Sequence, residues 1–186
     1  MAASATLCLP ANAGEAHREA GAHVHGQGSL AIAVENGAVE MELEAPGMDI
    51  VGFEHEATSD ADKAAVAKAQ ATLGDPLELF KVPAAAQCKV AGRDVALEGE
   101  DDKEKDGHDA KKDDHAEHGG GAGHTSFHAT YTLECDNLAA LTSIDFAYFR
   151  AFPGALKLDV NTVGANGQSG AEVTRESPVL DLAGKL

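Results

Sequence analysis

Residues 29–45 are predicted to form a β-hairpin. Apolar and polar residues alternate over 29–35 and again over 38–45, and the Asn36-Gly37 pair between them is the strongest short signal for a two-residue turn. Such a turn fixes the register of the two strands. The pairs predicted to face each other are Val34 with Val39, Ile32 with Met41, and Leu30 with Leu43. Because these pairs are all apolar, one face of the hairpin must be buried, and the other, which carries Glu40, Glu42 and Glu44, is left to solvent.

Residues 59–73 predict the one main helix. A serine and an aspartate, Ser59 and Asp60, can cap its start, and Gly74 follows its end as a stop signal. Its apolar face is mostly alanine, so the helix is expected to pack closely and to bury little surface. A last hairpin is predicted over residues 155–175. The predicted fold class is therefore α+β, with antiparallel β-hairpins and one main helix in a single domain.

The three cysteines suggest an exported protein. Cys8 lies in a small, apolar segment, residues 1–13, which closes on Ala-Asn-Ala and predicts a signal-peptide remnant, although it lacks a basic n-region. The alternative is an unstructured cytosolic N-terminus. Cys88 and Cys135 are then an even pair, as expected of one disulfide in an exported domain, residues 23–186. Two free thiols or a two-cysteine zinc site are the alternatives.

A long polar insertion, residues 99–124, separates two predicted strands. If Cys88 and Cys135 face each other in an antiparallel pair, Glu98 falls opposite Thr125, and the insertion extends from the tip of a hairpin. It contains nine acidic residues, four lysines and four histidines, and no aliphatic side chain larger than alanine. Such a segment cannot bury enough apolar surface to fold, so it is predicted to be disordered.

Charge and motifs exclude several classes of function. The formal net charge of −17 repels nucleic acid and anionic membranes and attracts cations. No apolar segment approaches the roughly 20 residues that cross a bilayer, so no membrane insertion is expected. The sequence contains no H-E-x-x-H, no G-x-S-x-G and no P-loop. No catalytic motif is therefore found; a catalytic zinc with an open position is the alternative, but no residue stands out as its general base.

Three histidines are predicted to converge at one end of the first hairpin. His23 and His25 are two residues apart, so in a strand both rings point to the same side. Extending the hairpin register sets His25 near Met48 and His23 near Ile50, and the chain then continues to His55. Three imidazoles with one open position are a known zinc geometry. The alternative is a set of solvated surface histidines.

The other histidines are predicted to be secondary. His124 and His128 flank the start of the strand after the insertion, and each is predicted to be either a fourth ligand or a point of transfer. For His128, an ordinary surface position is the alternative. His108, His115 and His118 lie among the acids of the insertion and are predicted to be weak, fast sites that gather cations. A solvated charge run is the alternative there.

Several motifs together resemble the ZrgA-type zinc-uptake proteins of Gram-negative bacteria. They are His23-Val24-His25-Gly26, the alternating hairpin, Ala45 to His55 with its Gly52-Phe53-Glu54-His55 element, the His- and Asp-rich insertion, Tyr131-x-x-x-Cys135, and Phe149-x-x-Phe152-Pro153. The resemblance extends from His23 to about Leu182.

The resemblance implies a periplasmic accessory protein that binds zinc. Such a protein helps to supply a high-affinity zinc ABC importer or its solute-binding protein, and it is not an enzyme. The ligand positions that it implies are His23, His25, His55 and His124. Two other functions fit the residues themselves. Imidazole discriminates poorly among zinc, copper and nickel, which allows a general metallochaperone or buffer. The acidic insertion also allows a metal-independent module that binds a basic partner.

Overall fold

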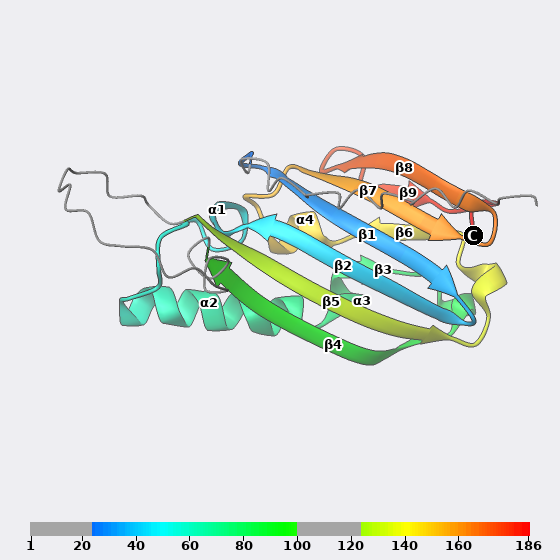
Figure 1. Ribbon diagram of the computed structural model, residues 1–186, viewed down its shortest axis with the longest axis horizontal. Helices are drawn as coiled ribbons and strands as arrows, with labels where there is room; N and C mark the ends of the chain where they lie inside the picture. The colour runs from blue at the N-terminus through cyan, green and yellow to red at the C-terminus, as the bar shows by residue number, and fades with distance from the viewer. Residues whose placement is uncertain (1–23, 100–123) are drawn as a thin grey trace, which may run out of the picture.

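The computed structural model describes residues 24–99 and 124–186 of the chain (Figure 1). The predicted signal-peptide remnant, residues 1–13, and nearly all of the predicted disordered insertion lie outside the described residues. So do the following histidines: His17, His23, His108, His115 and His118. In the two described segments, no helix is long and apolar enough to cross a membrane.

The described residues form the predicted α+β fold, with a six-stranded sheet as its main layer. The strands of this sheet follow the order β4-β5-β2-β1-β7-β8. Their bounds are β1 Gln27–Glu35, β2 Ala38–Pro46, β4 Cys88–Gly99, β5 Thr125–Cys135, β7 Lys157–Gly164 and β8 Gly167–Thr174. All neighbouring pairs are antiparallel except β1 with β7, which is parallel. That parallel pair was not predicted, because it joins two separately predicted hairpins.

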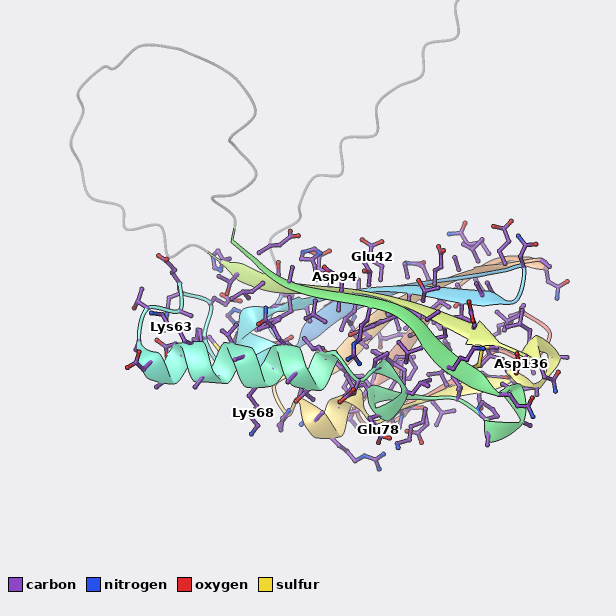
Figure 2. The ribbon with its side chains drawn as sticks, turned by 90° about the horizontal axis from the view of Figure 1, so that it is seen from below. Glu42, Lys63, Lys68, Glu78, Asp94 and Asp136 are labelled. Carbon is purple, nitrogen blue, oxygen red and sulfur yellow. A yellow bond between two sulfur atoms is a disulfide. The ribbon has the colours of Figure 1, made fainter. Side chains whose placement is uncertain are left out.

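A second layer covers one face of this sheet (Figures 1 and 2). It contains a three-stranded sheet in the order β3-β6-β9, with β3 Phe80–Lys81, β6 Ser143–Phe146 and β9 Val179–Asp181. It also contains helices α1 Gly47–Ile50, α2 Asp60–Leu73, α3 Pro76–Leu79 and α4 Tyr148–Ala151, and short 3₁₀ turns at Ala84–Ala86 and Leu138–Ala140. The hydrophobic core lies between the two layers, and the opposite face of the large sheet is open.

The first hairpin has the predicted register. Val34 pairs with Val39, Ile32 with Met41, and Leu30 with Leu43. The turn residues Asn36 and Gly37 have positive φ values of 52° and 89°, as a type I′ turn requires. Leu30, Ile32, Val39, Met41 and Leu43 are buried beneath the second layer and Val34 is half-buried, whereas Glu40 and Glu42 lie exposed on the open face. The alternation of side chains thus decides which face of the sheet is covered.

Helix α2 has the predicted bounds and the predicted weak burial. The Ser59 hydroxyl accepts a hydrogen bond from the backbone N–H of Asp62 at 3.1 Å, so Ser59 is the N-cap. Only Ala69 and Leu73 are buried within the helix.

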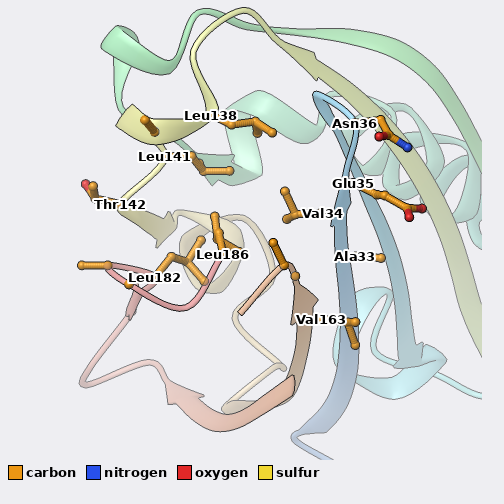
Figure 3. Close-up of a pocket in the computed structure, with 15 residues that line it drawn as sticks. Ala33, Val34, Glu35, Asn36, Leu138, Leu141, Thr142, Val163, Leu182 and Leu186 are labelled. Atoms are coloured by element: carbon orange, nitrogen blue, oxygen red, sulfur yellow. The ribbon is translucent and has the colours of Figure 1, made fainter. Parts of the chain in front are cut away.

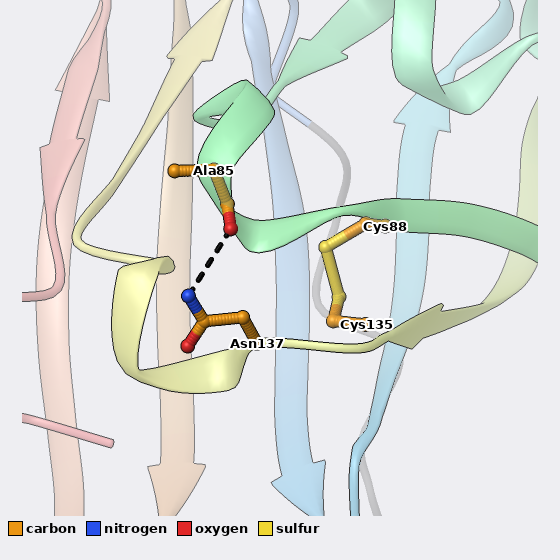
Figure 4. Close-up of a disulfide and its surroundings, with 4 residues drawn as sticks. All are labelled: Ala85, Cys88, Cys135 and Asn137. Carbon is orange, nitrogen blue, oxygen red and sulfur yellow. Dashed lines mark hydrogen bonds between the residues drawn. A yellow bond between two sulfur atoms is a disulfide. The ribbon is translucent and has the colours of Figure 1, made fainter.

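The β4–β5 pair contains the predicted disulfide and one departure from the predicted register. Cys88 and Cys135 are bonded and face each other (Figure 4). Beyond Val90, however, β4 has a bulge at Ala91, and Glu98 faces Ser126 instead of Thr125. The prediction was wrong by one residue because a bulge adds an unpaired residue to one strand. Since side chains alternate, this shift also moves every later side chain of β4 to the other face.

Candidate metal centre

Three chain segments meet at one end of the six-stranded sheet (Figure 1). His25 lies just before β1, Glu54 lies in the loop after α1, and His124 lies just before β5. His25 and His124 were predicted as ligands from the sequence. Glu54 was not, although it stands inside the Gly52–His55 element that the resemblance singled out.

The Glu54 carboxylate holds this group together. Its Oε2 lies 2.8 Å from Nδ1 of His124, and its Oε1 lies 3.0 Å from Nε2 of His25. The Glu54 side chain is 10% exposed, whereas the imidazoles of His25 and His124 are 56% and 51% exposed. The contact with His25 is not aligned as a hydrogen bond, so Oε1 has no hydrogen-bond donor among the described residues. A buried carboxylate oxygen in this state can still accept a proton or bind a cation.

The two histidines keep Glu54 ionised. Burial raises the pKa of the Glu54 carboxyl, but the polar contacts with His124 and His25 and the charges of both rings outweigh burial, and the pKa lies below its ordinary value. An ionised carboxylate only accepts hydrogen bonds, so Nδ1 of His124 must donate. In the neutral ring, Nε2 of His124 then carries the lone pair. A carboxylate behind an imidazole is the arrangement that orients metal-bound histidines.

Asp49 ties α1 to the residue after His25. The backbone N–H of Gly26 donates to Asp49 Oδ1 at 2.7 Å. The other oxygen, Oδ2, is buried without a hydrogen-bond partner among the described residues. Burial raises the pKa of the Asp49 carboxyl, the Gly26 hydrogen bond and His25 lower it, and the nearby charge of Glu54 raises it again. Two acids are therefore buried beside His25, which is an uncommon arrangement outside functional sites.

Gly47 lets these segments come together. A Cβ at this position would lie 2.6 Å from Thr125 Oγ1 and 2.7 Å from the Phe53 carbonyl oxygen. Thr125 follows His124, and Phe53 precedes Glu54, so both ligand-bearing segments close on the space left by the missing side chain. Gly47 is also where the chain leaves β2 and enters α1. The predicted extension of the strand to Met48 and Ile50 is therefore wrong, because those residues belong to a helical turn.

His55 makes different contacts from His25 and His124. Its ring stacks on Phe53 with 4.6 Å between ring centres, and its Nδ1 donates to the Glu56 carbonyl at 3.0 Å. With Nδ1 donating, a neutral His55 ring has its lone pair on Nε2. Because His23 is not described, the predicted convergence of three histidines stays a prediction. Across the described segments, no group of three or more His, Cys, Asp or Glu side chains is already arranged to hold a metal ion.

His128 lies on the open face of the sheet, apart from this group. Its Nε2 lies 3.6 Å from Glu98 Oε2 and 3.7 Å from Glu44 Oε1. It is four residues along the chain from His124, which is roughly 13 Å in an extended strand. Of the two predicted roles for His128, a fourth ligand beside His25 is the harder to reconcile with this distance.

A groove of about 600 Å³ lies at the other end of the first hairpin (Figure 3). Val34, Leu141, Leu182 and Leu186 are among the residues that line it. Glu35 is the one charged side chain among its described lining residues. An apolar groove of this kind does not suit a metal ion, which needs several polar ligands.

Comparison with known proteins assigns a family to this chain. The family model described as ZrgA family zinc uptake protein matches residues 22–182. That range includes both described segments almost entirely, and the insertion between them. No curated protein matches the chain.

Proposed function

The chain belongs to the ZrgA family of zinc uptake proteins, and from this we propose that it is a periplasmic, zinc-binding accessory protein. It captures zinc and helps to supply a high-affinity zinc ABC importer or its solute-binding protein. The family is one of zinc uptake proteins and not of enzymes. Zinc is the cargo in this proposal, so the site must both bind the ion and release it.

The convergence of His25 and His124 on Glu54 carries the proposal. Two imidazoles and one carboxylate are a known zinc donor set, and they leave one coordination position open. Ligand atoms of a tetrahedral zinc are about 3.3–3.4 Å apart, given bonds of about 2.0–2.1 Å. If zinc replaces the proton that His124 Nδ1 shares with Glu54, the present separations of 2.8 and 3.0 Å between Glu54 and the two imidazoles need to widen by only about 0.3–0.6 Å to become ligand–ligand distances. An open position also allows a receiving protein to take the ion.

The remaining histidines are proposed to act in support. His55 and His23, which lies outside the described residues, are further candidate ligands. The histidines of the insertion, His108, His115 and His118, are proposed to collect zinc weakly and raise its local concentration. Screening limits long-range attraction to about 8 Å at physiological salt, so the insertion helps at short range.

The disulfide supports an exported location. Disulfides persist in oxidising compartments such as the periplasm and are rare in the cytosol. The Cys88–Cys135 bond also leaves zinc no thiolates from these two residues. Metal capture by the described residues must then use imidazole and carboxylate groups, which agrees with a site that exchanges its ion.

The test is zinc titration of the full chain by calorimetry, with controlled free zinc, and with E54Q and E78Q compared. Gln has the shape of Glu but lacks its charge. Loss of a ligand or of its orienting partner typically weakens metal affinity by about 10–100-fold, so E54Q should lose at least tenfold at the tight site. Glu78, which pairs with Lys81 on the surface, is the matched control, and E78Q should bind as the wild type does.

Three outcomes would overturn the proposal. If E54Q and the wild type have the same tight-site affinity, the centre at Glu54 is not the zinc site. If copper or nickel displaces zinc at the free concentrations of each metal in the periplasm, the protein is a general metal buffer. A chain whose melting temperature does not respond to zinc would favour the metal-independent interaction module, since a ligand at 100 times its Kd adds about 2.7 kcal/mol.

A further inference from the structure

A second cluster of metal-ligating side chains lies on the open face of the six-stranded sheet. Its centre is the imidazole of His128 on β5. Glu44 on β2 and Glu98 on β4 flank it, with oxygens 3.7 and 3.6 Å from Nε2. The Ser126 hydroxyl lies 3.3 Å from the same nitrogen. Three neighbouring strands thus bring two carboxylates within 4 Å of one imidazole nitrogen, although the three groups are not yet arranged around a common centre.

The β-bulge at Ala91 creates this cluster. Without the bulge, Glu98 would pair with Thr125, whose side chain belongs to the covered face, and Glu98 would share that face. With the bulge, Glu98 pairs with Ser126 and lies on the open face beside His128. Val95 and Leu97 turn instead toward the hydrophobic core, against which they pack. One extra residue in β4 therefore both completes the core and adds the second carboxylate.

The distances and charges suit a divalent cation. Separations of 3.6 and 3.7 Å exceed the spacing of about 3.3–3.4 Å between ligands of a tetrahedral zinc by only a few tenths of an ångström. Glu44 and Glu98 are 41% and 43% exposed, so their side chains are free to adjust, whereas His128 is 23% exposed and is held between them. Among the described residues, no lysine or arginine forms an ion pair with either glutamate. A neutral imidazole with two carboxylates carries a formal charge of −2, which one zinc ion balances.

We propose that Glu44, His128 and Glu98 form a second zinc site, weaker and faster in exchange than the centre at Glu54. It is weaker because its carboxylates are half exposed, where water competes for the ion and screens its charge. The last pair of the β4–β5 ladder, Gly99 with Thr125, is adjacent to this cluster, so the site lies at the base of the insertion. Zinc can bind there transiently before it reaches the tighter centre at Glu54. This inference rests on the proposed function, with zinc as the cargo.

The same face of the sheet offers a control pair of acids. Glu42 on β2 and Asp94 on β4 both pair with Thr130 of β5, whereas Glu44 pairs with His128 and Glu98 pairs with Ser126, two residues from the histidine. Figure 2 shows Glu42 and Asp94 on the open face, away from α2. The variant E42Q/D94N therefore removes the same two charges from the same face, but at a position without an imidazole. Both double variants change exposed or half-exposed side chains, which usually alters stability by less than about 0.5 kcal/mol per site.

The experiment follows the ring nitrogens of ¹⁵N-labelled histidine in the full chain by NMR during a zinc titration. The His128 signal is identified as the one that H128Q lacks. In the wild type, this signal should respond after the tight site is filled, and it should still respond in E54Q. In E44Q/E98Q its zinc midpoint should rise at least about tenfold, as loss of metal-supporting groups does. In E42Q/D94N the midpoint should change less than twofold.

Each contrary result has a distinct meaning. If E42Q/D94N raises the midpoint as much as E44Q/E98Q does, only the net charge of the face matters, and the second site does not exist. If His25 and His124 respond to zinc but His128 does not, the inference is overturned and the proposed function stands. If no ring responds, the proposed function fails as well.

Discussion

Removing the Cys88–Cys135 bond tests whether the stability of the fold can be lowered without changing the affinity for zinc. The variant C88A/C135A is preferable to a reductant, because a thiol reductant would itself bind zinc. The two cysteines are 47 residues apart in the sequence. In the chain-entropy account, closing a loop of this length lowers the entropy of the unfolded chain enough to stabilise the native state by about 4 kcal/mol. The variant should therefore unfold at a lower urea concentration, with a free energy of unfolding smaller by about that amount.

The same variant should keep its zinc affinity. Strand β5 has Thr125 at one end and Cys135 at the other, and its 11 residues span roughly 33 Å. His124 and the disulfide are therefore at opposite ends of the β4–β5 ladder. Under native conditions, the zinc dissociation constant of the variant should agree with that of the wild type within twofold. Zinc at 100 times its Kd should add the same 2.7 kcal/mol or so to both proteins.

Urea unfolding with and without zinc, together with calorimetry, measures both quantities. The control is S59A, which removes the N-cap hydrogen bond of α2 and leaves the ladder unchanged. If C88A/C135A binds zinc tenfold more weakly while it is still folded, the zinc site is coupled to the disulfide end of the sheet, and the assignment to Glu54 is wrong. If the free energy of unfolding falls by less than 1 kcal/mol, the loop-closure account does not hold for this chain.

The remaining predictions concern the metal centre and the helix. G47A should weaken zinc binding at least tenfold in calorimetry, because the new Cβ pushes Thr125 and Phe53 away from residue 47. The control is G99A, whose Cβ would have nothing within 4 Å, and it should bind zinc as the wild type does. The pKa of Glu54 is lower in the folded protein than in the unfolded chain. Its ionisation therefore stabilises the metal-free protein at pH values above the pKa in the unfolded chain, about 4.5. This contribution is lost as the pH falls through the lower folded pKa, and urea melts of wild type and E54Q should converge toward acid pH. S59A should reduce the free energy of unfolding by about 1 kcal/mol and leave zinc affinity unchanged.

The candidate centre could be predicted only in part. His25 stood out because it lies two residues from His23 just before a strand, and His124 stood out because it lies at the start of the strand after the insertion. Glu54 did not stand out, because the chain has 31 acidic residues and nothing local distinguishes a buried one. What distinguishes Glu54 is its contact with His124, 70 residues away. The one indication in the sequence was the position of Glu54 within the Gly52–His55 element, directly before His55, which was itself predicted to be a ligand.

The sequence by itself determined the local elements of this protein. The Asn36-Gly37 turn fixed the first register, Ser59 fixed the start of α2, and the even pair of cysteines predicted the disulfide. Each of these rests on interactions between residues that are close in sequence, or on a count that allows few pairings. Such interactions leave a pattern in the sequence, so the hairpin register, the start of α2 and the disulfide could be predicted correctly.

Only the tertiary structure decided which distant residues meet. The parallel pairing of β1 with β7, the bulge at Ala91 and the approach of Glu54 to His124 all depend on contacts between separate segments. The bulge shows the physical reason most clearly. An extra residue in β4 is set by how the strand packs on the core, yet it determines whether Glu98 faces the core or His128. Alternation within a strand is a local property, but the face on which it begins is decided by packing.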